Sequence, residues 1–213
     1  MRFTDLYTKP AEFFDNLDTS QFEVRVARTA EDREKALQVR ARGYHMYGNL
    51  GPEEAAAKPN ETTFLAVDQD DFPVGTLRVL DRRRGKIELD NFLDVDALLD
   101  EDEKPCAEAT RFAIPKHPKG LIIKILLWKA YFSHCRALGI RTMLVSCRPL
   151  LARNYLFLLF EDIGPQGYYK HRHLKNKEHR TYKRDLTNLR ELWCQAHHPL
   201  YNFMFVRQTR IHV

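Results

Sequence analysis

The sequence predicts one α/β domain built on a mixed sheet, and three observations support this. Apolar segments at residues 63–67 and 74–80 flank a turn-rich connection, which predicts an antiparallel hairpin. An apolar strand at 107–114, a long apolar helix at 120–138 and an alternating strand at 141–147 predict a strand–helix–strand unit. The chain has 213 residues, 44% hydrophobic and 30% charged, which is typical of one large globular domain.

The expected organisation has three parts. Residues 1–21 carry aromatic and leucine side chains at helical spacing, which predicts an arm that packs on the body. Residues 22–186 form the domain. Residues 187–213 form a terminal helix and an aromatic tail that must dock on it, since an exposed tail of this kind is sticky.

Within the domain, the first strand is expected at 22–27. Thr29 lies three residues before Asp32 and can cap a helix that runs to Tyr44, because its hydroxyl can satisfy a free backbone N–H. Residues 48–61 are small and polar and predict a loop that can act as a lid.

The remaining predicted elements follow in chain order. They are a sheet continuation at 87–89, a short helix at 95–99, a C-cap at Gly139, a helix at 150–161, a short strand at 167–169, a basic surface loop at 170–184 with a strand near 181–186, and a helix at 189–196.

Composition limits the class of protein. The net charge is +5, which favours an anionic partner. The first residues lack the apolar core of a signal peptide, and lysines interrupt the longest apolar run. The four cysteines are widely spaced and form no metal pattern, so we expect reduced, buried thiols and a cytoplasmic protein. The histidines lack metal spacing, and no metal is expected.

Two opposite charges stand in the apolar strand at 107–114. Glu108 and Arg111 are three residues apart, so a regular strand would point them to opposite faces, and a bulge would re-aim one. Buried charges are rare unless they have a partner or a task. We therefore expect these two side chains to mark a site.

Three segments resemble one family. They are Arg40-x-x-x-Tyr44, Pro73-Val-Gly-Thr-Leu-Arg-Val79 and Glu108-Ala-Thr-Arg-Phe-Ala-Ile114. The chain resembles GNAT-like acyltransferases, and more closely N-acyl amino acid synthases of the FeeM type and the related acyl-homoserine-lactone synthases. The resemblance spans about residues 22–164 and implies a central, mostly antiparallel mixed sheet flanked by helices.

The chain departs from these families in three places. The acidic residues that homoserine-lactone synthases carry before the hairpin have no clean match, which favours an amino acid or another amine as acceptor. The Gly-rich pyrophosphate loop of relatives that bind coenzyme A is replaced by residues 115–120. Many GNAT enzymes have a tyrosine on the helix after the fifth strand that protonates the leaving thiolate, and Phe160 is expected in that place here.

The resemblance implies an N-acyltransferase that moves a long fatty acyl group from an acyl carrier protein, or less favourably coenzyme A, to an amino acid amine. No cofactor is bound permanently, and the acyl-phosphopantetheine is the donor. Glu108 is the candidate base, since burial raises a carboxyl pKa toward a useful value. The alternative is a structural ion pair of Glu108 with Arg78 or Arg111.

The acceptor site is expected to contain Arg40, Tyr44, Arg78, Arg111 and Phe112. Guanidiniums on strands can clamp a carboxylate, although structural pairing of Arg78 and Arg111 with Glu108 or Glu88 would look the same in sequence.

The donor site is expected around the start of the helix at 120–138, where free N–H groups favour a phosphate. Its candidate residues are Ala113, Ile114, Lys116, Lys119, Gly120, Leu121 and Ile125. An acyl tunnel would be lined by Leu121, Ile122, Ile125, Leu126, Leu150, Leu151, Leu156 and Phe157, or these residues are simply core.

The basic segments 82–86 and 170–184 can dock an acidic acyl carrier protein, or they are solvated loops. Peripheral contact with a membrane through a lipid product is a further expectation. Three rival hypotheses stay open: an autoinducer synthase, a basic nucleic-acid-binding module carried by 170–184 and its tyrosines, and a catalytically silent scaffold.

Overall fold

The computed structural model describes residues 8–45 and 58–213. The lid predicted at 48–61 lies mostly outside these residues. The helices are α1 (Ala11–Asp15), α2 (Ala30–Tyr44), α3 (Val95–Leu98), α4 (Gly120–Ala137), α5 (Ala152–Phe157), α6 (Leu189–Gln195) and α7 (Tyr201–Phe205). The strands are β1 (Phe22–Val26), β2 (Glu61–Asp68), β3 (Pro73–Asp81), β4 (Cys106–Ala113), β5 (Thr142–Cys147), β6 (Glu161–Asp162), β7 (Tyr168–His171), β8 (Lys177–Asp185) and β9 (Ile211–His212).

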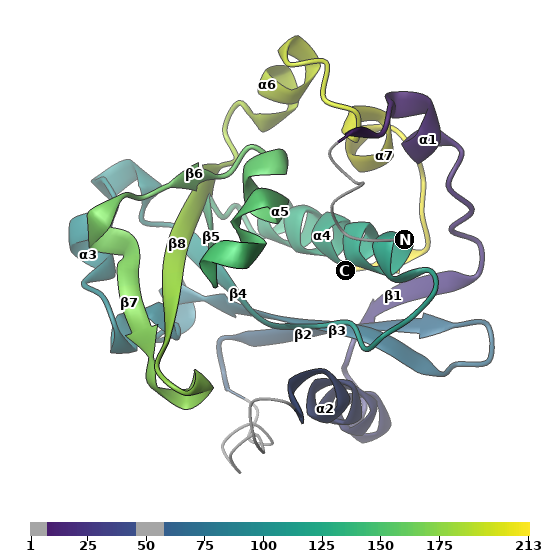
Figure 1. The fold of residues 1–213 in the computed structure, drawn as a ribbon, viewed down its shortest axis with the longest axis horizontal. Helices are drawn as coiled ribbons and strands as arrows, with labels where there is room; N and C mark the ends of the chain where they lie inside the picture. Colours follow the sequence, from purple (N-terminus) through teal and green to yellow (C-terminus); the bar gives the residue numbers. More distant parts are fainter. Residues whose placement is uncertain (1–7, 46–57) are drawn as a thin grey trace.

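In this part of the chain the strands form one mixed sheet in the order β6-β8-β5-β4-β3-β2-β1-β9, with β7 paired to β8. The β4–β5 and β1–β9 pairs are parallel and the other pairs are antiparallel. The helix α2 covers one face of the sheet and α4 covers the opposite face (Figure 1). The predicted mixed, mostly antiparallel sheet is confirmed.

Local chemistry explains the main elements. The Thr29 hydroxyl accepts a hydrogen bond from Asp32 N at 3.0 Å, so α2 begins where the cap predicts. The hairpin of β2 and β3 is also confirmed. The helix α4 ends at Leu138, and Gly139 follows with a φ of +65°, as expected of a residue that terminates a helix.

Three predicted elements are wrong. Residues 87–89 do not extend the sheet, because Leu89 begins a 3₁₀ turn and its N–H bonds a side chain of β4. The helix after Pro149 starts as a 3₁₀ turn and ends at Phe157 rather than at residue 161. The basic segment 170–184 is mostly the antiparallel hairpin of β7 and β8 rather than a surface loop.

The first and last helices of the described ranges, α1 and α7, contact each other on the α4 side of the sheet (Figure 1). The buried Lys129 of α4 donates hydrogen bonds to the carbonyl of Phe203, at 2.7 Å, and to that of Arg207. Arg207 in turn donates to the carbonyl of Asp15 at 3.1 Å. These bonds fix the aromatic tail on α4 and tie it to the N-terminal arm.

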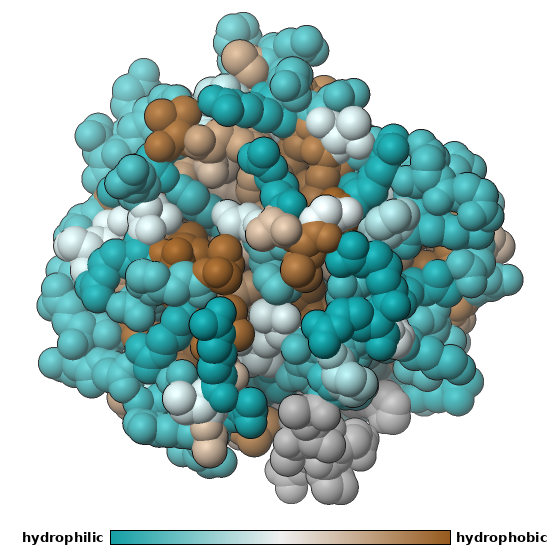
Figure 2. All heavy atoms as spheres, turned by 180° about the vertical axis from the view of Figure 1, so that it is seen from behind, coloured by the Kyte–Doolittle hydropathy of each residue, from teal (hydrophilic) through white to brown (hydrophobic). Residues whose placement is uncertain are grey.

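The surface is mostly polar. The face in Figure 2 is largely hydrophilic, with hydrophobic side chains gathered in small separate patches across its middle. None of the helices in the described ranges is long and apolar enough to cross a membrane.

The packing of α4 on the sheet depends on Gly75 in β3. A Cβ atom there would lie 2.6 Å from Ile123 Cγ2 and 3.1 Å from Leu127 Cδ1, both on α4. We expect Gly75→Ala to lower the free energy of unfolding by about 1–3 kcal/mol through overpacking. Urea denaturation measures this change.

Gly120→Ala is the matched control. A Cβ at this first residue of α4 would meet its nearest neighbour at 3.7 Å, which is ordinary contact. Alanine there should leave stability unchanged or raise it by up to about 1 kcal/mol, because glycine is the poorer helix former. Equal urea midpoints for the two variants would contradict the close approach at Gly75.

Candidate active site

A cleft of about 280 Å³ opens where β4 and β5 part. The two strands pair only from Cys106 with Thr142 to Ala109 with Val145. Beyond that point residues 110–114 and 146–148 line opposite sides of the cleft. The two strands therefore splay apart, and the carboxyl end of β4 is left without pairing to β5.

A backbone irregularity in β4 shapes the same site. Arg111 has a φ of +51°, and the register of β3 with β4 shifts at this point. Such a conformation is strained for a residue with a side chain, and strain of this kind is concentrated at functional sites. Glu108 and Arg111 consequently line the same cleft, so the prediction for a regular strand fails and the bulge alternative is correct.

The charges around the cleft centre on Glu88. Its Oε1 pairs with Arg78 Nη2, and its Oε2 accepts from Arg111 Nη1 at 2.9 Å. Arg78 Nε also donates to Thr110 Oγ1 at 3.0 Å. Both guanidiniums thus pair with Glu88, which is one of the two structural partners, Glu108 or Glu88, that the sequence left open.

Glu108 lies behind this ion pair at the floor of the cleft. Its side chain is 2% exposed, and its Oε2 accepts a hydrogen bond from Leu89 N at 3.1 Å. Burial, followed by the nearby charge of Glu88, raises the pKa of Glu108 to about 8. The carboxyl is therefore mainly protonated at neutral pH in the empty cleft, and a modest change in its surroundings can make it a base.

The residues predicted for the acceptor divide into two groups. Tyr44, Arg111 and Phe112 line the cleft, and the Tyr44 hydroxyl donates to the Phe112 carbonyl at 3.3 Å. Arg40 and Arg78 are 2% and 1% exposed and lie outside the lining. Arg40 Nη2 donates to a threonine hydroxyl of β2 at 2.8 Å, so these two arginines support the cleft from behind.

The residues predicted for the donor also divide. Ala113 and Ile114 line the cleft, while Lys116, Lys119, Gly120, Leu121 and Ile125 do not. Lys116 is exposed, and the side chain of Lys119 bonds the amide of Gln21. His117 Nδ1 accepts from Lys119 N at 3.1 Å, which occupies one N–H at the start of α4. Ile125 is fully buried in the core.

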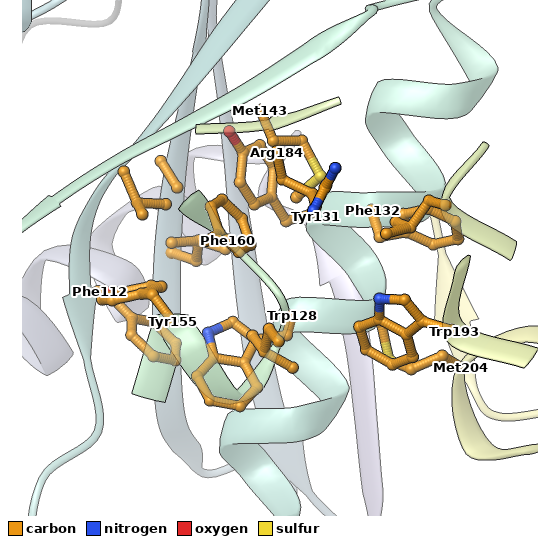
Figure 3. A pocket seen from close by; sticks show the side chains of 15 residues that line it. Phe112, Trp128, Tyr131, Phe132, Met143, Tyr155, Phe160, Arg184, Trp193 and Met204 are labelled. Atoms are coloured by element: carbon orange, nitrogen blue, oxygen red, sulfur yellow. The ribbon is translucent and has the colours of Figure 1, made fainter. Parts of the chain in front are cut away.

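An aromatic cavity adjoins the cleft. It measures about 30 Å³ and shares Ala109, Phe112 and Tyr155 with the cleft. Figure 3 shows its rings, which come from β4, α4, α5, α6 and, at Phe160, the segment between α5 and β6. None of the eight residues predicted for an acyl tunnel lines this cavity, and Leu150 is 84% exposed. One of the eight, Leu151, lines the cleft instead, and the acyl tunnel stays a prediction.

Tyr155 is a residue that the sequence interpretation missed. The helix α5 ends at Phe157, so Phe160 lies beyond it, whereas Tyr155 is on the helix and lines both the cleft and the cavity. Burial raises the pKa of Tyr155 well above its ordinary value. The helix predicted at 150–161 already contained Tyr155, but the place of the tyrosine was assigned to Phe160, near its predicted end.

The hairpin of β7 and β8 supplies further missed residues. Tyr169, His171 and His179 line the cleft, and Tyr169 stacks on His179 with ring centroids 5.6 Å apart. The alternation of side chains along β7 could have indicated these residues. The histidines and the basic composition of the segment led to the prediction of a surface loop instead. In the two described ranges, no three His, Cys, Asp or Glu residues are grouped so that they could hold a metal ion.

The fold and this cleft define an acyltransferase of the GNAT-like class. The sequence model of the family described as N-acyl amino acid synthase FeeM matches residues 35–175, about two thirds of the chain. The chain therefore belongs to this family and is an acyltransferase.

Solved structures show the same fold. FeeM, an N-acyl amino acid synthase from uncultured soil microbes, is 18% identical with a TM-score of 0.71, over 83% of this chain and 97% of that chain. The AHL synthase LasI is 16% identical with a TM-score of 0.57, over 88% and 98%. A GNAT-family acetyltransferase from Staphylococcus aureus is 13% identical with a TM-score of 0.52, over 78% and 99%. No curated protein matched the chain.

The raised pKa of Glu108 predicts how stability depends on pH. In the unfolded chain this carboxyl has its ordinary pKa of 4.5, against about 8 when folded. The stability that the protonated form contributes is complete below pH 4.5 and is lost as pH rises to about 8. The Glu108→Gln variant stays neutral at every pH. Its free energy of unfolding, relative to that of the wild type, should therefore rise by a few kcal/mol between about pH 5 and 9, because each unit of pKa shift corresponds to about 1.4 kcal/mol.

Glu103→Gln is the control for chemical denaturation across that range. Glu103 pairs with Lys183 at 2.7 Å, and its pKa is lowered, so it stays charged throughout. Its difference from the wild type should not change with pH. A flat difference for Glu108→Gln would show that Glu108 is already ionised at the acidic end of the range.

Proposed function

We propose that this synthase transfers a long fatty acyl group from an acyl carrier protein to the amine of an amino acid. One observation carries the proposal: the cleft that holds Glu108 adjoins, across Phe112 and Tyr155, a cavity lined almost entirely by apolar side chains. A thioester in the splay would have its carbonyl beside Glu108 and its acyl chain among the rings.

The reaction needs one proton removed and one supplied. The amine nitrogen bonds to the thioester carbonyl carbon, the C–S bond breaks, and the amine proton passes to Glu108. The leaving thiolate takes a proton from Tyr155, whose raised pKa keeps its hydroxyl protonated until then. Backbone N–H groups of the splayed end of β4 are the candidates to bind the developing oxyanion.

Glu108 must lose its proton before it can accept one from the amine. An acceptor enters with an ammonium group, and this cation would lower the pKa of Glu108 toward neutrality. Glu108 and the ammonium each lose one proton to water before the neutral amine attacks, and Glu108 then accepts the proton that the amine loses in the reaction. Arg111 and Arg148 line the cleft and can hold the acceptor carboxylate. This arrangement would place the amine between the carboxyl group and the thioester.

The cavity has to open for a long chain. Its volume of about 30 Å³ is little more than that of one methylene group. Phe112, Trp128 and Tyr155 form a chain of rings with centroids 6.3 Å apart at its entrance. Rotation of these rings would create the channel, so acyl length is set by how far they can move.

The carrier protein would meet the β7–β8 side of the cleft. Lys170, Arg172, Lys175 and Lys177 are exposed on this hairpin, which also lines the cleft through His171. The second basic segment offers less charge for docking because two of its arginines are matched: Arg82 pairs with Asp90 and Asp96, and Arg83 with Asp81. Acidic carrier helices would be attracted to the hairpin, with rates that fall as salt rises.

Mass spectrometry of lipid extracts tests the activity. Cells that overproduce the wild type should accumulate an N-acyl amino acid, and Glu108→Ala should reduce it by about 10²–10⁴-fold if the base is lost. Soluble protein levels of the two must match. Extracts with the same product level from both would remove Glu108 from the reaction, and extracts without any such product would contradict the proposed function.

Substitutions at two neighbouring tyrosines test the assignment of Tyr155 as the general acid. Tyr155 and Tyr182 stack with centroids 6.2 Å apart, but only Tyr155 lines the cleft and the cavity. Tyr155→Phe should lower kcat for thiol release by about 10²-fold or more, with little change in KM. Tyr182→Phe should keep kcat near that of the wild type. Equal kcat for all three proteins would show that another group, or water, protonates the thiolate.

A further inference from the structure

The aromatic cavity holds two buried hydrogen-bond donors that lack an acceptor in the described part of the chain. Trp128 on α4 and Trp193 on α6 line the cavity and are 5% and 2% exposed. The Nε1 atom of each indole is buried without a hydrogen bond. Figure 3 shows both nitrogens on ring edges that face the other lining side chains.

Buried donors are normally paired, and a tryptophan indole can only donate. The cavity itself shows the usual outcome at Tyr131, whose hydroxyl donates to the Ala107 carbonyl at 2.6 Å. A water molecule at Trp128 would need about two to four polar partners, and the lining around it is apolar. The unpaired donors therefore call for an acceptor that a bound ligand brings.

The two indoles lie at different depths. The Trp128 ring is 6.3 Å from the rings of Phe112 and Tyr155, the two aromatic residues that the cavity shares with the cleft. Trp193 lies farther in, against Phe205 at 5.5 Å. An acyl chain that enters from the cleft would pass Trp128 with its first carbons.

We propose that the acyl chain carries an oxygen near the thioester, as 3-hydroxyacyl and 3-oxoacyl chains do, and that the Trp128 N–H binds this oxygen. The proposal rests on the proposed function, because it needs the acyl chain in this cavity. An unsubstituted chain would leave the donor unpaired, whereas a 3-hydroxy or 3-oxo oxygen pairs it. Trp128 then determines which acyl thioester the protein prefers as its acyl donor.

Competition between donors of equal length tests this. Acyl-phosphopantetheine thioesters with a 3-hydroxy, a 3-oxo or no substituent are compared by kcat/KM. The wild type should favour the oxygenated donors by about tenfold, the value of one buried hydrogen bond. Trp128→Phe keeps an aromatic ring and should bring the ratio to about one, while Trp193→Phe should retain the preference.

A binding measurement on the wild type avoids dependence on the folding of a variant. The chain has only 2 tryptophans, so ¹⁵N-indole labelling gives two indole signals, which Trp193→Phe assigns. A non-hydrolysable 3-hydroxyacyl thioether should move the Trp128 N–H signal downfield, and the unsubstituted thioether should not.

The possible failures can be told apart. Turnover of unsubstituted donors with a wild-type ratio near one, or a ratio that Trp128→Phe leaves unchanged, overturns this inference alone. A Trp128 signal that responds equally to both thioethers overturns it as well. Failure to turn over any acyl thioester overturns the proposed function and this inference with it.

Discussion

The conformation of Arg111 in β4 is the constraint on which the site depends. A regular strand would send Glu108 and Arg111 to opposite faces and would continue its pairing with β5. The positive φ at Arg111 brings both side chains to one cleft, and pairing with β5 has already stopped at Ala109. The opening between the strands is therefore created by the backbone conformation, and the side chains line it. Such strain persists because the core on both faces of the sheet holds β4 in place.

The buried charges are arranged to leave one carboxyl group unlike the others. Glu88 lies between Arg78 and Arg111, which satisfies its charge, whereas Glu108 is 2% exposed beside that negative partner. Burial and the charge of Glu88 both raise the pKa of Glu108, and the bond from Leu89 N opposes them. The pKa of Glu108 is thus moved toward neutral pH, where a group of this kind can act as a base. Arg78 holds Glu88 from behind the cleft, whereas Arg111 holds it from within the cleft lining.

Much of the fold could be predicted from the sequence, because it depends on local signals. The cap at Thr29, the turn-rich hairpin and the apolar periodicity of α4 each determine an element within one or two residues. The identity of Glu108 as a buried strand carboxylate was equally readable. The partners of that carboxylate were not, because Glu88 directly precedes a 3₁₀ turn and Tyr155 lies on a helix whose end was predicted four residues too late. The aromatic cavity was missed for the same reason: its lining combines side chains from eight helices and strands that are distant in sequence.

The placement of the thioester beside Glu108 is tested most directly by a crystal structure with a non-hydrolysable acyl-pantetheine thioether. We expect pantetheine between the splayed ends of β4 and β5, the atom that replaces the carbonyl beside Glu108, and the acyl chain past Phe112 and Tyr155 among rings that have moved apart. An acyl chain bound elsewhere, with the aromatic cavity still closed and Glu108 away from the thioether, would contradict this placement.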